Sequence, residues 1–263
     1  MPTGLGDEVL WFSPSLDSSP YSNDLSVNGF DLSFINGATT VVDTLNGGTR
    51  AYSLDGTNDY LQVSGSTLQG TAPFDTVSTQ MSMSTWAYLS TFDGAPSGGG
   101  SLTGKYSGAS TTFSLNHRSD DVGVLQGSAY SQNDTDASYS QDSIESAAGT
   151  VDPSTGVWYH YLLTYDTSKS GATSRLKFYL NGSLVSVATI ISTGTGDRIR
   201  SKSGVNLLIG GISTSYIWGG RIDDYRIFSR VLTDAEISHL SSSRATLGGA
   251  GGTYTHRTLL GVG

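Results

Sequence analysis

The chain is built from short segments in which apolar residues alternate with polar ones, and glycine-rich turns separate these segments. Alternation with a period of two is typical of a β-strand that has one buried face. The pattern therefore predicts a fold of many strands rather than helices. The clearest segment spans residues 81–89 and is expected to bury four side chains on one face, Met81, Met83, Ala87 and Leu89.

Pairs of turn-forming residues mark where neighbouring strands reverse. Asn181-Gly182 lies between the apolar segments 176–180 and 184–188, and this pair suits the positive φ angles of a type I′ hairpin turn. Asn28-Gly29 divides the segment 25–34 in the same way and predicts a second hairpin. Both pairs therefore predict tight turns between consecutive strands.

Only one helix is indicated, near the C-terminal end of the chain. Thr233 and Glu236 have the spacing of a capping box, in which each side chain satisfies a backbone N–H group at the start of a helix. Ile237 and Leu240 would supply the apolar face of this helix. Residues 126–156, in contrast, are rich in Ser, Asp, Gln and Asn, and we expect them to form a long polar loop.

Length and composition fit one large domain and exclude several classes of protein. The 263 residues carry a formal net charge of −9, which argues against nucleic acid as a partner because phosphate binding needs clustered basic side chains. The absence of cysteine excludes disulfides and thiol catalysis and fits folding in the cytoplasm. No apolar run approaches the roughly 20 residues of a membrane-spanning helix, and residues 1–7 do not resemble a signal peptide. We therefore expect no membrane association and no signal-directed secretion.

Several stretches, in this order, resemble the laminin G-like branch of the concanavalin A-like lectin/glucanase superfamily. The resemblance implies an all-β fold, a two-sheet antiparallel jelly-roll sandwich over residues 1–240 with its first and last strands side by side. One short C-terminal helix would follow, and residues 241–263 would form a flexible, Gly-rich tail. The stretches are 17–24, where Pro20 and Ser22 replace glycines of the family, 54–60, 81–87, 158–166, 178–182 and 220–228.

Glycosidases of this superfamily hydrolyse with two carboxylates, usually glutamates a few residues apart on one strand. The three glutamates of this chain, Glu8, Glu145 and Glu236, lie in separate parts of the sequence. The adjacent Asp223 and Asp224 would point to opposite faces of a strand. The four histidines are scattered and lack the spacing of a zinc site. We therefore expect a protein that binds its ligand without catalysing a reaction.

Calcium is the cofactor that the resemblance implies, between an early loop and a late aspartate. Asp17, Asn23 and Asp24 offer oxygen atoms in the early loop, and the fold would bring Asp223 of the final strand beside them. Ca²⁺ takes roughly 6–8 such oxygen ligands. Aspartate also bonds its own backbone in turns, so ordinary turn formation explains the same residues. Both interpretations stay open on the sequence alone.

A carbohydrate site would combine exposed aromatic rings, which stack on the apolar side of a sugar, with polar side chains that bind its hydroxyl groups. Tyr130 and Tyr139 in the expected polar loop are one pair of candidates. Tyr216 and Trp218, just before the last strand, are the other pair. The sequence does not choose between the two pairs.

The end of the tail has a less uniform composition than the glycine-rich stretch before it. These residues fit either a frayed terminus or a peptide that docks onto a neighbouring protein. The candidate docking residues are Tyr254, His256, Arg257, Leu259 and Leu260.

An acidic, cysteine-free chain that is rich in Ser, Thr and Gly and shaped like an extracellular binding module resembles structural proteins of tailed phages. We therefore expect a virion protein of the capsid-decoration, head-fibre or tail-fibre type, made in the host cytoplasm. Its partners would be other copies of itself, as a homo-oligomer, and other virion proteins of the capsid or tail. The jelly roll would project outward toward host surface glycans. The alternative is a soluble or secreted calcium-dependent carbohydrate-binding module.

Overall fold

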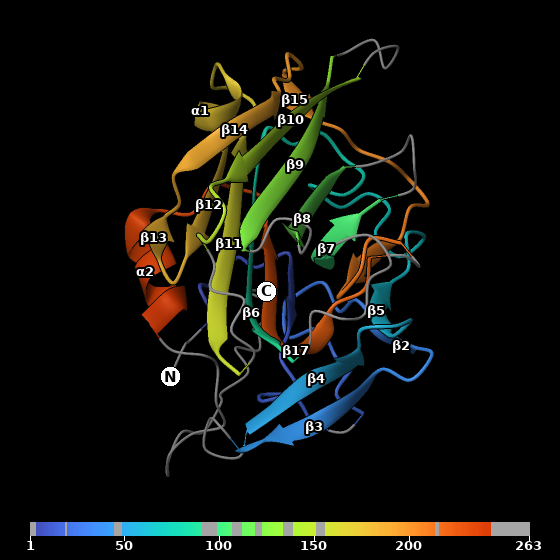
Figure 1. The fold of residues 1–263 in the computed structure, drawn as a ribbon. Helices are drawn as coiled ribbons and strands as arrows, with labels where there is room; N and C mark the ends of the chain where they lie inside the picture. The colour runs from blue at the N-terminus through green and yellow to red at the C-terminus, as the bar shows by residue number, and fades with distance from the viewer. Residues whose placement is uncertain are drawn as a thin grey trace.

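Two antiparallel β-sheets pack face to face and enclose the core of the domain (Figure 1). The fold class expected from the sequence is therefore confirmed, including its antiparallel strand pairing. The computed structural model describes residues 4–18, 20–44, 49–90, 99–106, 112–118, 123–133, 139–150, 156–213 and 216–242.

Among the described residues the first sheet has eight strands, and the first and last strands, β1 and β17, pair in it. Leu10 on the first strand of the chain lies opposite Ile227 on the last, as the resemblance implied. In spatial order the strands are β13 (Ser183–Leu184), β12 (Leu176–Leu180), β11 (Trp158–Asp166), β6 (Gln80–Leu89), β17 (Gly219–Phe228), β4 (Thr49–Asp55) and β3 (Thr39–Asp43), while β1 (Leu10–Phe12) also pairs with β17.

The second sheet has nine strands and carries the face described in the next section. In spatial order they are β14 (Val187–Ser192), β10 (Tyr139–Ser146), β9 (Val124–Gln132), β8 (Phe113–Arg118), β7 (Gly99–Lys105), β16 (Leu207–Ile209), β5 (Tyr60–Val63) and β2 (Ser33–Ile35), and β15 (Arg198–Ile199) pairs with β9.

Strands β9 and β10 occupy about half of the segment 126–156, so the long polar loop expected there is wrong. The reason lies in the residues that face the core, because several of them are small. Gly127 is one, and a Cβ atom at this position would lie 2.6 Å from the ring of Phe178 on β12. The opposite sheet therefore supplies the bulk that fills the core here, and β9 needs no large apolar residue of its own at this position.

Two local sequence signals, the alternation over residues 81–89 and the Asn181-Gly182 turn, are confirmed. On β6, Met81, Met83 and Ala87 are buried in the core as predicted, and Leu89 packs against them. The turn residues Asn181 and Gly182 have φ angles of 48° and 79° and join β12 to β13, so this hairpin is confirmed.

The hairpin predicted at Asn28-Gly29 does not form, because backbone N–H groups of this segment bond to the Asp24 side chain and not to a partner strand. The carboxylate of Asp24 accepts hydrogen bonds from the backbone N–H groups of Ser26 at 2.9 Å and Phe30 at 3.1 Å. These bonds hold residues 24–30 as a compact loop, and the strand β2 begins only after it.

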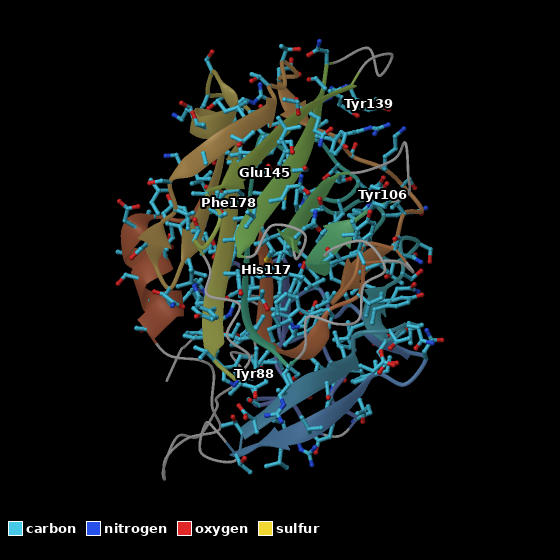
Figure 2. All side chains as sticks on the ribbon, viewed as in Figure 1. Tyr88, Tyr106, His117, Tyr139, Glu145 and Phe178 are labelled. Carbon is cyan, nitrogen blue, oxygen red and sulfur yellow. The ribbon has the colours of Figure 1, made fainter. Side chains whose placement is uncertain are left out.

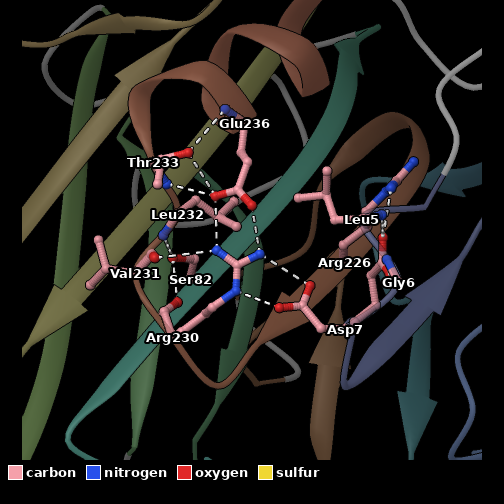
Figure 3. A network of polar contacts seen from close by, with 11 residues as sticks. Leu5, Gly6, Asp7, Ser82, Arg226, Arg230, Val231, Leu232, Thr233 and Glu236 are labelled. Carbon is pink, nitrogen blue, oxygen red and sulfur yellow. Dashed lines mark hydrogen bonds and ion pairs between the residues drawn. The ribbon is translucent and has the colours of Figure 1, made fainter.

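In the described part of the chain two helices lie outside the sheets, the short α1 (Ala172–Arg175) and the C-terminal α2 (Asp234–Ser242). The predicted capping box of α2 is confirmed, since the Thr233 N–H donates to the Glu236 carboxylate at 2.8 Å and the Glu236 N–H donates to the Thr233 hydroxyl at 3.4 Å. Figure 3 shows Arg230 bridging Glu236 and Asp7, which lowers the pKa of the Glu236 carboxyl to about 2. Among the described residues, no helix has the length and apolar character needed to cross a membrane.

Helix α2 covers a second, smaller apolar cluster on the outer face of the eight-stranded sheet. Ile237 and Leu240 are buried there as predicted. They pack against Leu162 of β11 and Phe228 of β17, whose side chains point away from the main core. The helix is therefore held by tertiary packing as well as by its cap.

Candidate functional site

One outer surface of the sandwich is lined by polar and aromatic side chains from three neighbouring strands. On β9, Leu125 and Ala129 face the core, so Gln126, Ser128 and Tyr130 point outward. The strands on either side of β9 extend this pattern. We call the surface the polar face and define it as Asn116 of β8, Gln126, Ser128 and Tyr130 of β9, and Tyr139, Gln141, Ser143 and Glu145 of β10.

The first row of the polar face runs straight across the three strands. Asn116 lies opposite Gln126, and Gln126 lies opposite Glu145. The Gln126 amide donates to the Glu145 carboxylate at 2.9 Å, and the Asn116 amide donates to the Gln126 carbonyl oxygen at 3.4 Å. These bonds fix the planes of two amides and one carboxylate, so their remaining donors and acceptors have defined directions.

The next positions along the strands continue the row of hydrogen-bonding groups. The hydroxyls of Ser128 and Ser143 lie 2.9 Å apart across β9 and β10. The Gln141 amide donates to the Ser128 hydroxyl at 3.1 Å. Both serines are buried among their longer neighbours, so they orient those neighbours rather than project beyond them.

An aromatic cluster ends the polar face. The rings of Tyr130 and Tyr139 have centroids 6.0 Å apart, and the guanidinium of Arg200 lies 3.6 Å from the Tyr139 ring centroid. Tyr139 is 48% exposed, whereas Arg200 is almost completely buried behind it. Arg200 thus covers one side of the ring by a cation–π contact and leaves the tyrosine presented to solvent on a fixed support.

The polar face is long enough for an extended ligand. Tyr139 and Glu145 lie six residues apart on the same strand, which corresponds to about 20 Å at the rise of a β-strand. Figure 2 shows Tyr139 near one end of the sheet and Glu145 further along β10. Amides, hydroxyls and a carboxylate in rows, with an exposed ring at one end, can bind a chain of hydroxyl-bearing units.

The two histidines within the described strands do not contribute to this face. Burial lowers the pKa of His117 to about 4, and its ring packs edge-on against Trp218. Burial, with a smaller contribution from the positive charge of Arg226, lowers the pKa of His160 to about 3. His160 of β11 packs against Trp86 of the neighbouring strand β6, and both strands belong to the eight-stranded sheet. Both rings are neutral near pH 7, and packing accounts for their positions.

The residues proposed for calcium are held in separate hydrogen-bond networks. Asp17 and Asn23 come together, with the Asn23 side-chain amide donating to Asp17 Oδ1 at 2.8 Å. Asp24 accepts N–H groups of its own loop, and Asp223 accepts two serine hydroxyls at 2.8 and 2.9 Å. No group of three or more His, Asp or Glu side chains arranged for a metal ion occurs in the described part of the chain. The calcium site stays a prediction.

The second aromatic pair differs from the prediction. Trp218 is fully buried, and its indole N–H donates to the Tyr88 carbonyl at 3.2 Å, so it cannot serve as an exposed platform. The physical reason is that its ring fills the core against Tyr161. Tyr216 is 38% exposed and stays a candidate. The proposed docking residues Tyr254, His256, Arg257, Leu259 and Leu260 lie outside the described residues.

Sequence reasoning missed the polar members of the face, although a signal for them was present. From Tyr139 to Glu145 every second residue is outward-facing, and Gln141 and Ser143 complete that series. The alternation was hidden because the core-facing positions include a charged residue, Asp142, where an apolar one would be expected. The support from Arg200 depends on a distant segment and has no local signature.

These features define a domain with a lectin-like fold, an antiparallel two-sheet sandwich with rows of polar and aromatic side chains on an outer face. The family model described as the Concanavalin A-like lectin/glucanases superfamily matches residues 55–238, more than half of the sequence. The chain belongs to this superfamily, and the resemblance at that level is confirmed. Among curated proteins, no sequence matches the chain.

Solved structures share the fold at low sequence identity. The receptor-binding domain of botulinum neurotoxin D aligns with a TM-score of 0.61 and 16% identity over 90% of this chain and 52% of that domain. The ligand-binding domain of botulinum neurotoxin serotype D in complex with N-acetylneuraminic acid aligns with a TM-score of 0.57 and 15% identity over 90% of this chain and 50% of that domain. Domain 4 of AbnA, a GH43 extracellular arabinanase from Geobacillus stearothermophilus, was solved in complex with arabinotriose. It aligns with a TM-score of 0.54 and 15% sequence identity over 89% of this chain and 98% of that domain. The chain therefore spans about half the length of these neurotoxin domains.

Proposed function

We propose that this domain binds an extended carbohydrate along the polar face and does not hydrolyse it. The observation that carries the proposal is the pairing of ordered polar rows with the exposed Tyr139 ring, which Arg200 supports from behind. Hydroxyl-rich ligands need directed donors and acceptors together with an apolar surface for the ring faces of the sugar. The polar face supplies both within about 20 Å along one strand.

Similar folds with bound saccharides support this class of ligand. The neurotoxin D domain was solved with N-acetylneuraminic acid and the arabinanase domain with arabinotriose. The position of the site in the present protein is argued from its own residues, because identities of 15% do not transfer individual contacts. Neither the sugar nor the linkage is inherited from these proteins.

The positions of the three glutamates support the proposal of binding without hydrolysis. A glycosidase needs two carboxyl groups across the scissile bond. Of the three glutamates, Glu8 pairs with the buried Arg226 and Glu236 pairs with Arg230, while Glu145 bonds to Gln126 on the polar face. Two of the three are therefore committed to structural ion pairs far along the chain from the third. Incubation with oligosaccharides that bind should release no reducing ends, and measurable turnover would contradict the proposal.

The test of binding is a glycan array followed by calorimetry with the best oligosaccharide ligand. Tyr139→Ala removes the exposed ring and should raise the Kd about tenfold, the equivalent of about 1.4 kcal/mol. Tyr216→Ala is the matched control, since it removes a tyrosine of similar exposure from outside the polar face. Loss of binding in Tyr216→Ala with none in Tyr139→Ala would place the site elsewhere.

Calcium binding is a separate proposal that concerns Asp17 and Asn23. Their direct contact places a carboxylate beside a side-chain amide, and Ca²⁺ would replace the hydrogen bond between them once the Asn23 amide turns its carbonyl oxygen toward the ion. A ligand that binds only the folded state raises the melting temperature. We expect Ca²⁺ to raise it in the wild type and not in Asp17→Ala, and an unchanged melting temperature in EDTA and in Ca²⁺ would refute the proposal.

We also propose that the protein presents this domain on a phage virion, as its acidic, cysteine-free composition suggested. The candidate docking segment begins after α2, which ends at Ser242. Deleting residues 243–263 should therefore prevent incorporation into particles while the isolated domain keeps its glycan affinity. Normal incorporation of the truncated protein would contradict docking through this segment.

A further inference from the structure

A short segment of chain lies across the ends of β9 and β10, beside the aromatic end of the polar face. This segment, residues 193–197, joins β14 to β15, and we call it the strap. The Thr195 N–H donates to the Ser140 hydroxyl at 2.8 Å, and the Gly196 N–H donates to the Ser131 hydroxyl at 3.1 Å. The strap is thereby bonded to both strands.

The buried ion pair between Asp142 and Arg175 forms hydrogen bonds with the strap and holds it in place. Asp142 of β10 is fully buried, and its Oδ2 atom lies 3.0 Å from Nε of Arg175, the last residue of α1. The other carboxylate oxygen accepts the Gly194 N–H at 2.8 Å. The guanidinium donates to the carbonyl groups of Gly194 at 3.1 Å and of Gly196 at 2.7 Å. Tyr165 completes the network by donating its hydroxyl to Asp142 at 2.7 Å.

The strap approaches its supports so closely that only glycine fits at two positions. A Cβ atom at Gly194 would lie 2.6 Å from the Asp142 carboxylate, and one at Gly196 would lie 2.4 Å from the backbone nitrogen of Gln132. The path of the strap is therefore set by contact with Asp142 and with β9.

The strap leads directly into Ile199 and Arg200, of which Arg200 supports Tyr139. Ile199 of β15 donates its N–H to the Ser78 carbonyl at 2.7 Å, and Arg200 donates its N–H to the Tyr130 carbonyl at 2.8 Å. The Arg200 side chain then lies over the Tyr139 ring. We propose that the buried Asp142–Arg175 pair positions the sugar-binding end of the polar face by holding the strap, and hence Arg200, in place. Asp142 and Arg175 are positioning residues, and this inference rests on the proposed function.

Positioning explains this pair better than stability does. Burying two charges costs hydration free energy, and replacing a buried ion pair by apolar residues of similar volume is often neutral or stabilising. Arg175 makes bonds that an apolar residue could not make, because its planar fork reaches two strap carbonyls at once. A preorganised site loses less conformational entropy when it binds a ligand. The Asp142–Arg175 pair would therefore raise the affinity by reducing this entropy cost.

The test uses two variants of the full chain. Arg175→Lys keeps the charge opposite Asp142 but loses the two-carbonyl fork. The double variant Asp142→Leu with Arg175→Met removes both charges together, so it avoids the uncompensated buried charge that a single neutral substitution would leave. Both should raise the Kd for the oligosaccharide about threefold to tenfold. Both should also speed hydrogen exchange at the Ile199 and Arg200 amides, a change that a general loss of stability would not confine to these positions.

Arg230→Met is the control, because it removes an ion-pair network at α2 that the strap does not contact. It should lower the melting temperature without changing the Kd or the exchange at Ile199 and Arg200. If the Arg175 variants behave like this control, the proposal is overturned. If the wild type binds no glycan at all, the proposed function fails, and unchanged exchange in the Arg175 variants would then show independently that the pair does not hold the strap.

Discussion

Two buried histidines should make the folded state sensitive to mild acid. His160 is completely buried, with Nε2 bonded to the Ser84 hydroxyl at 2.8 Å, and its pKa is lowered to about 3. His117 is buried against Trp218, and its pKa is lowered to about 4. In the unfolded chain both imidazoles have a pKa near 6.5. Below that pH the unfolded state binds two protons that the folded state excludes.

The sign and the size of the effect follow from this difference. A histidine whose pKa is depressed by folding contributes its full stability above the unfolded pKa, and this contribution is lost as the pH falls toward the folded pKa. Each histidine costs about 1.4 kcal/mol per pH unit in that window, so the pair lowers the free energy of unfolding by about 4 kcal/mol between about pH 7.5 and pH 5. This is a large share of the stability of an ordinary domain, about 5–15 kcal/mol.

Urea-induced unfolding of the wild type and of the double variant His117→Gln with His160→Gln measures this effect across the same pH range. The double variant should lose little stability in the window, and each single variant should remove about half of the slope. Glu236 does not affect this measurement. Its pKa is lowered to about 2 in the folded state, so its contribution to the free energy of unfolding is lost only below the pKa of an unfolded-state glutamate, about 4.3. Parallel loss of stability in the wild type and the double variant would refute the reasoning.

Three further predictions concern stability, and each is measured by urea unfolding. Glu236→Gln removes the charge that Arg230 binds and weakens the helix cap, so it should cost about 1 kcal/mol, and no loss would show that the cap is redundant. Gly220→Ala places a Cβ 2.0 Å from the Tyr88 carbonyl oxygen and should cost about 3 kcal/mol or more, whereas wild-type stability would contradict this close approach. Met83→Ala empties a fully buried position and should cost about 2–5 kcal/mol, so a cost below about 1 kcal/mol would mean that the core refills the space.

Local patterns in the sequence predicted the elements that depend on near neighbours. The Asn181-Gly182 turn and the capping box of α2 satisfy their own hydrogen bonds within a few residues or within one hairpin, and the alternation that marks β6 is likewise contained in one segment, although its strand partners β11 and β17 are distant in sequence. The resemblance to the superfamily supplied the remaining step, the two-sheet arrangement with β1 beside β17. These features could be predicted without knowing which elements pack against one another in the folded protein.

The candidate site could be predicted only in part from the sequence, because its residues are brought together by segments that are distant in the chain. Tyr130 and Tyr139 were selected as aromatic residues, but their segment was expected to be a loop because its core-facing positions are small or charged. Strand pairing placed Asn116, Gln126 and Glu145 in one row, and no local pattern joins residues that far apart in the chain. Trp218 was misassigned because composition alone cannot tell a buried ring from an exposed one.

The sequence by itself determined that this protein is a β-sandwich with tight turns and one capped helix, because strand alternation, turn chemistry and capping act over a few residues. Only the tertiary structure decided which side of β9 and β10 faces outward. Phe178 of the opposite sheet fills the space above Gly127, and Arg175 of α1 neutralises the inward-facing Asp142. Burial depends on partners that are distant in sequence, so a polar strand becomes a binding face only when another part of the chain completes its core.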